Sequence, residues 1–180
     1  ALSSAASDVY KRQLVDGMAR ERQQYSGDGS HQLHAVIQTL GDITLPYRFV
    51  NTFSQGLSID GYFMDSWPAW DRLARTVERQ MHLTGWGPIL DHSIGFCFDA
   101  FHYYMYTGDL QGLKEVYPRL LSFFSYLYKL TDKSEHLVPV ENLGMCSVYI
   151  DHEAYKQTKH KQLALNLYIV AMCQNALSTL

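Results

Sequence analysis

The chain has 180 residues, of which 47% are hydrophobic and 18% are charged, and its formal net charge is −3. Such a chain can bury one hydrophobic core, so we expect one domain rather than a disordered polymer. No basic run exceeds a pair, so the electrostatic footprint of a nucleic-acid-binding protein is missing. No apolar stretch approaches the roughly 20 residues of a membrane span, so neither nucleic acid nor a membrane is expected as a partner.

Apolar residues recur with a three-to-four-residue period along most of the chain, which is typical of α-helices. Strand signals are scarce, and short loops with glycine, aspartate or proline separate the periodic segments. This pattern predicts an all-α fold of antiparallel helical hairpins with a site formed by loops at one end. The predicted helices span 3–15, 29–40, 43–57, 69–82, 89–107, 110–129 and 154–179. The longest irregular stretches are 58–68 and 131–153.

The polar run Asp16–Asp28, DGMARERQQYSGD, is predicted to be a loop that leads into the helix at 29–40. It holds three carboxylates and two arginines, and glycines bracket it, each of which costs about 1 kcal/mol in a helix interior. Asp28 or Ser30 is then the expected N-cap, where the helix dipole favours a charged carboxylate. A plain charged loop remains the alternative to a site.

Carboxylates in different surroundings suit acid–base chemistry on a glycosidic bond. One group must be protonated at neutral pH to give its proton to the leaving oxygen, while others stay charged to hold the sugar or activate water. Partial burial and neighbouring carboxylates would raise the pKa of Glu21, whereas Arg20 and Arg22 would lower it. The sequence leaves this balance open.

The order Arg20-Glu21-Arg22, Tyr25 and Gly27-Asp28, with Asp16 upstream, resembles the signature of the inverting α-L-rhamnosidases, which are six-hairpin (α/α)6 glycoside hydrolases. The resemblance implies hydrolysis of terminal α-L-rhamnosides with inversion, and no cofactor or metal is expected. It implies that Glu21 is the general acid. The implied sugar contacts are Asp16, Arg20, Tyr25, which replaces the family's usual tryptophan, and Asp28.

Two further stretches are similar to the same family, DGYFMDSWP at 60–68 and GWGPILDHSIGFCFDAFHYYMYTGDLQGLKEVYP at 85–118. The resemblance implies that Trp67, Trp86 and Asp91 also contact the sugar, and His92 could share the place of Asp91. A tryptophan that only anchors a long loop is the alternative for Trp67.

The second stretch also predicts how two helices are used. The helix at 89–107 is apolar nearly all round, as expected of a helix in the inner ring. The helix at 110–129 has one polar side that can face solvent, as expected of a helix in the outer ring. Between them, Gly108 is predicted to be a left-handed C-cap and Asp109 the N-cap of the next helix. We expect no catalytic role for this turn.

Six hairpins need roughly 350–400 residues, so 180 residues can close only about half of a ring. Residues 1–180 are therefore expected to form part of one (α/α)6 catalytic domain, with the remainder of that domain and accessory β-domains as partners. The general base is expected outside this stretch, because no tryptophan-glutamate motif follows residue 130. The acidic cluster from Asp151 to Glu153 is predicted to be an N-terminal helix cap.

Two other classes stay open. One is another (α/α)6 sugar hydrolase, of the unsaturated uronyl hydrolase or glucosidase type, and the other is a non-catalytic helical interaction domain.

Three cysteines without CxxC spacing are predicted to be buried free thiols, Cys97, Cys146 and Cys173. The compartment stays open, with a periplasmic or secreted location favoured over a cytoplasmic one. His31 and His34 are predicted to be surface or packed side chains, because no third metal ligand is near.

Overall fold

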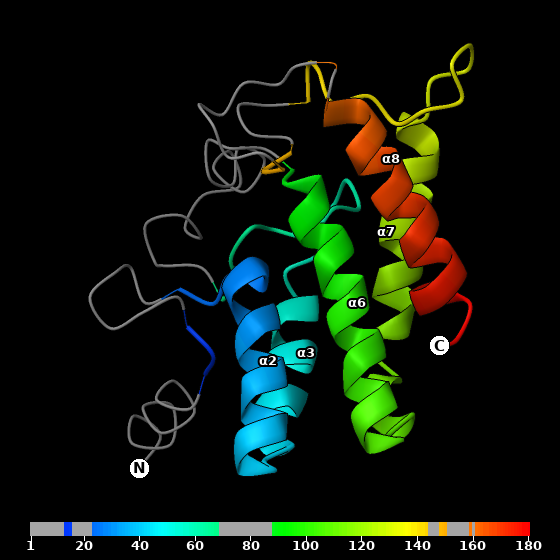
Figure 1. The fold of residues 1–180 in the computed structure, drawn as a ribbon. Helices are drawn as coiled ribbons and strands as arrows, with labels where there is room; N and C mark the ends of the chain where they lie inside the picture. Colours follow the sequence, from blue (N-terminus) through cyan, green and yellow to red (C-terminus); the bar gives the residue numbers. More distant parts are fainter. Residues whose placement is uncertain (1–12, 16–22, 69–87, 144–147, 151–158, 160) are drawn as a thin grey trace.

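A computed structural model describes residues 13–15, 23–68, 88–143, 148–150, 159 and 161–180 (Figure 1). Helices account for 60% of these residues, and no strand forms among them apart from two isolated bridges. The prediction of an all-α fold is confirmed for this part of the chain. The helices are α2 (Ser26–Leu40), α3 (Thr44–Ser54), α6 (Leu90–Thr107), α7 (Tyr117–Leu130) and α8 (Lys161–Ala171), with a 3-10 turn at Gln111–Leu113 and a π-helical segment at Met172–Leu177.

Helix α6 is the central element. It packs against α2, α3, α8 and the π-helical segment, and Figure 1 shows it between α2 and α8. Its bounds match the helix predicted at 89–107, because apolar residues cover nearly every side of it. Leu90, Ile94, Phe96, Cys97 and Ala100 have no exposed surface. A helix with this pattern is stable only when other elements surround it.

An aromatic cluster joins three helices and one loop. The Phe96 ring of α6 lies 4.8 Å from Phe53 of α3 and 4.9 Å from Phe63 of the 55–68 loop, measured between ring centroids. Phe63 in turn lies 5.7 Å from Phe123 of α7. Burial of each phenylalanine contributes about 1.5–3 kcal/mol relative to exposure. A large share of the aromatic content therefore stabilises the core, and the cluster fixes the loop against the helices.

Helix α2 begins earlier than the sequence predicted. Its N-cap is Tyr25, without a side-chain hydrogen bond, and Asp28 lies inside the first turn. The predicted N-cap at Asp28 or Ser30 is therefore wrong, and the end of the predicted loop is helical. Tertiary packing explains the difference, because the missing side chains at Gly27 and Gly29 admit the rings of His92 and Phe49. This contact outweighs the low helix propensity of glycine.

A Gly29→Ala substitution is expected to destabilise the fold by about 1–2 kcal/mol. The new Cβ would overlap the Phe49 ring, and overpacking typically costs 1–3 kcal/mol, which exceeds the roughly 1 kcal/mol gained in helix propensity. Gly95→Ala is the matched control, because a Cβ there would meet only the Tyr168 hydroxyl at 3.5 Å. Urea unfolding midpoints should fall for the first variant and hold or rise for the second. Equal midpoints would contradict the packing argument.

The helix predicted at 110–129 is broken in two. A 3-10 turn at Gln111–Leu113 precedes α7, which has Pro118 in its first turn. Gly108 is the left-handed C-cap of α6, with φ of 68°, as predicted. The Asp109 carboxylate accepts hydrogen bonds from the Gly112 amide at 2.8 Å and the Tyr103 hydroxyl at 2.7 Å. Asp109 therefore stabilises the 3-10 turn, and the prediction that it caps the next long helix is wrong.

The remaining bounds also differ from the sequence prediction. Helix α3 ends at Ser54, before the predicted end at 57, and Pro46 lies in its first turn. Helix α8 begins at Lys161, and the predicted start at 154, like the helix at 69–82 and most of that at 3–15, lies outside the described residues. Cys97 is buried and Cys173 half-buried, both as free thiols, whereas Cys146 lies outside the described residues.

Candidate functional site

The loop at 55–68 is hydrogen-bonded to the start of α2. Tyr25 and Ser66 form an antiparallel bridge. The Gln24 side-chain amide donates to the Trp67 carbonyl at 2.8 Å, and the Trp67 amide donates to the Gln24 carbonyl at 3.1 Å. Trp67 is half-buried, and its Cβ lies so close to Gly56 that a side chain there would clash. Trp67 is thus held at the start of α2 by hydrogen bonds and by packing.

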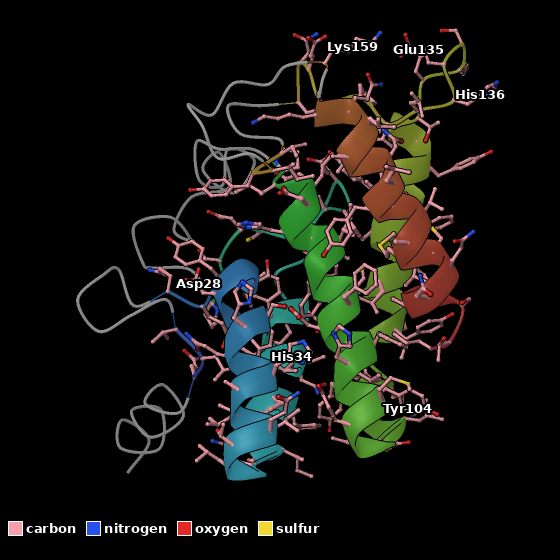
Figure 2. All side chains as sticks on the ribbon, in the orientation of Figure 1. Asp28, His34, Tyr104, Glu135, His136 and Lys159 are labelled. Carbon is pink, nitrogen blue, oxygen red and sulfur yellow. The ribbon has the colours of Figure 1, made fainter. Side chains whose placement is uncertain are left out.

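The start of α2 carries a carboxylate. Asp28 is half-buried in the first helical turn, and Figure 2 shows it at the N-terminal end of the helix. Ser26 joins this end to α6, because its hydroxyl donates to the His92 carbonyl at 3.2 Å.

The first turn of α6 supplies a carboxylate and an imidazole. Asp91 is 9% exposed, and its Oδ1 accepts a hydrogen bond from the Tyr149 amide at 2.9 Å. The His92 ring packs on Gly27, where an added Cβ would lie 3.2 Å from Nε2. Burial lowers the pKa of His92, and the carboxylates of Asp91 and Asp28 oppose that shift. The imidazole is therefore neutral at pH 7 although two acidic residues are near.

Asp65, which the sequence analysis missed, lies in the same loop as Trp67. It is 8% exposed, and its Oδ1 meets no hydrogen-bond partner within the described part of the chain. Burial raises its pKa to about 6, and hydrogen bonds from the backbone amides of Ser66 and Asp65 itself oppose the rise. A carboxyl group that titrates near the working pH is the kind that acid–base catalysis uses. A carboxylate beside the apolar Met64 in a loop rich in aromatics was the available signal.

A second polar cluster lies further along the same two helices. We call it the α2–α6 seam, and it pairs Ser26, Ser30, His34 and Gln38 of α2 with His92, Asp99, His102 and Tyr106 of α6. The four residues of α2 are spaced by four, so they share one face of the helix. The His34 and His102 rings lie 4.6 Å apart. The Tyr106 hydroxyl hydrogen-bonds His34 Nδ1 at 3.1 Å and accepts from Gln38 at 3.0 Å.

The seam buries polar atoms that lack partners. Asp99 has no exposed surface, and neither of its carboxylate oxygens makes a hydrogen bond among the described residues. Burial raises its pKa to about 8, while the nearby Ser30 hydroxyl opposes the rise. Burial, followed by His34, lowers the pKa of His102. Asp99 is thus protonated and His102 neutral at pH 7.

Four of the predicted site residues lie at one end of the helices. Tyr25 and Asp28 lie at the start of α2, Trp67 in the loop bonded to it, and Asp91 at the start of α6. The remaining ones, Asp16, Arg20, Glu21 and Trp86, lie outside the described residues, as do Asp151 and Glu153. Convergence of the three carboxylates Asp16, Glu21 and Asp28 stays a prediction.

The histidines of α2 pack or face solvent as the sequence indicated. His34 is half-buried against His102, and His31 is exposed. In the part of the chain that the structure describes, no three His, Cys, Asp or Glu side chains gather in a way that could hold a metal ion. Within the same part, no helix combines the length and apolarity that crossing a membrane requires. Comparison of the chain with known protein families, curated proteins and solved structures found no match.

Proposed function

We propose that the chain is part of an inverting α-L-rhamnosidase-like glycoside hydrolase with (α/α)6 architecture. One observation carries the proposal: the described positions that match the family signature come from three segments that bond directly to one another. The bridge from Tyr25 to Ser66 joins the start of α2 to the loop at 55–68. The Ser26 hydroxyl joins α2 to α6, and the Ser93 hydroxyl donates to the Phe63 carbonyl at 3.3 Å, which joins α6 to the loop.

The chemistry of these segments fits a neutral sugar. The Asp28 side chain can accept hydrogen bonds from sugar hydroxyls, and Tyr25 and Trp67 are half-buried residues whose rings can pack on the apolar face of a sugar. Glu21 is proposed as the general acid that protonates the leaving oxygen. The base that activates water must lie about 6.5–9.5 Å across the sugar from this acid, and we propose that it belongs to the remainder of the catalytic domain.

Exposed apolar faces on two helices support the proposed remainder of the domain. Helix α7 exposes Leu121, Phe124 and Tyr128, spaced three and four residues apart, and α8 exposes Leu163, Leu167 and Val170. Such stripes typically pack against further helices. The same faces support the second candidate, a non-catalytic helical interaction domain, so sugar binding must decide between them.

Calorimetric titration with L-rhamnose tests the proposal. Measurable binding is expected, and Asp28→Asn should weaken it about tenfold, because a hydrogen bond to a charged group is typically worth 1.5–3 kcal/mol and 1.4 kcal/mol is a factor of ten. Glu115→Gln is the matched control, since Glu115 is an exposed carboxylate before α7. Binding of D-galacturonate in place of L-rhamnose would favour the uronyl hydrolase class. Absence of sugar binding would leave the interaction domain.

A further inference from the structure

The Asp91 carboxylate is used within the protein. Its Oδ1 accepts the Tyr149 amide proton at 2.9 Å, across 58 residues of chain. With only 9% of its surface exposed, Asp91 presents little of itself to a ligand. The hydrogen bond instead fixes the segment at 148–150 to the first turn of α6.

The fixed segment places an aromatic ring beside an imidazole. The Tyr149 and His92 ring centroids lie 5.2 Å apart, with an angle of 50° between the ring planes. His92 also packs on Gly27, in the first turn of α2, one residue before Asp28. The buried Nδ1 of His92 has no hydrogen-bond partner among the described residues. Two aromatic rings therefore lie next to the first turn of α2, which carries Asp28.

We infer that His92 and Tyr149 form one wall of the sugar site and that Asp91 is a positioning residue, which acts by holding Tyr149 against His92. The inference rests on the proposed function, since it assigns the wall to a pyranose. Pyranoses offer an apolar C–H face for the Tyr149 ring and hydroxyls for Asp28. The His92 ring contacts the start of α2 at Gly27, and Tyr25 of the same end is the other candidate for ring packing.

Substitutions at Asp91 separate the two roles it could have. Asn keeps an oxygen that accepts the Tyr149 amide proton but removes the negative charge, whereas Ala removes both. A positioning role predicts that L-rhamnose binds Asp91→Asn within about twofold of the wild-type affinity and Asp91→Ala about tenfold more weakly. Direct contact between the charge and the sugar predicts similar losses for both variants, which would overturn the assignment.

The wall itself is tested at Tyr149 by calorimetric titration with L-rhamnose. Tyr149→Ala and Tyr149→Leu should each weaken binding about tenfold, and Leu keeps apolar volume in case the Ala variant folds poorly. Wild-type affinity in the Leu variant would overturn the wall while leaving the proposed function intact. Failure of the wild-type chain to bind L-rhamnose would instead overturn the proposed function, and the wall with it.

A ligand-free measurement tests the geometry. In NMR spectra of the unliganded chain, the ring protons of His92 lie in the shielding field of Tyr149, so Tyr149→Leu should shift them. Asp91→Ala should cause a similar shift and Asp91→Asn little change, because only Ala releases the segment. His92 signals that stay unchanged in both Tyr149→Leu and Asp91→Ala would overturn the positioning role.

Discussion

Replacing Asp99 by Asn is expected to make the protein more stable than the wild type at pH 8.5. Asp99 is fully buried in the α2–α6 seam, and burial raises its pKa from 3.8 to about 8. Above that pH the folded state must hold a buried charge that has no hydrogen-bond partner among the described residues, which lowers its stability. An amide at the same position is uncharged at every pH.

The direction of the effect follows from the two protonation states. The unfolded chain releases the Asp99 proton near pH 4, whereas the folded chain keeps it until about pH 8. The stability that comes from the proton on folded Asp99 is therefore fully present below pH 4 and is lost as pH rises from about 4 to about 8. The loss is at most on the order of 6 kcal/mol, because one pKa unit corresponds to about 1.4 kcal/mol.

Urea unfolding at pH 4, 6 and 8.5 measures this effect. Asp99→Asn should match the wild type within about 1 kcal/mol at pH 4, since it buries amide donors without acceptors, and exceed it at pH 8.5. Asp65→Asn is the matched control, because the pKa of Asp65 is raised only to about 6. The stability that Asp65→Asn gains over the wild type should be nearly complete by pH 6. Parallel pH profiles for wild type and Asp99→Asn would contradict the assignment.

The α2–α6 seam also contains histidines, and their effect on how stability depends on pH has the opposite sign to that of Asp99. Burial lowers the pKa of His34 and His102, so the unfolded state binds protons that the folded state refuses. Stability from these residues is present above pH 6.5 and is lost as pH falls through their lowered values. Asp99→Asn should leave the loss of stability at low pH in place, because the histidines cause it. The effects of the histidines and of Asp99 on stability can therefore be separated in one experiment.

Helices with a strong apolar period could be predicted from the sequence, whereas the role of glycine in α2 could not. Helix α6 was predicted within one residue at its start because its pattern is apolar nearly all round. The start of α2 was missed because helix propensity is local, whereas Gly27 and Gly29 serve contacts with rings more than 15 residues away. A break before α7 could have been placed from Pro118, which belongs in a first turn.

The candidate site was predictable in its polar residues and not in their partners. Asp28 and Asp91 were chosen from the resemblance to the rhamnosidase family, and both lie in the first turn of a helix. The hydrogen bond from Tyr149 to Asp91 depends on how distant segments pack, which no local pattern encodes. Asp99 could have been noticed, since a lone carboxylate amid Phe98 and Ala100 in an apolar run predicts either a buried acid or a strained core.

Glu21→Gln is expected to lower hydrolysis of natural rhamnosides by about 10²–10⁴-fold in the complete catalytic domain. A general acid protonates the leaving oxygen, and this help matters most when the leaving group is a poor one. An activated aryl rhamnoside, whose phenolate leaves unaided, should lose far less. Measuring kcat/KM for both substrates with wild type and Glu21→Gln therefore isolates proton donation from binding.

Asp16→Asn and Asp28→Asn are the matched controls for Glu21, because groups that hold the sugar act on either substrate. Each should weaken both reactions alike. Equal losses on the two substrates for Glu21→Gln would reassign Glu21 from proton donor to sugar contact. The chain of 180 residues alone is expected to show at most residual turnover, because the proposed base lies in the remainder of the domain. Full activity would instead assign the base to this chain, where Asp151 and Glu153 are the acidic residues to replace next.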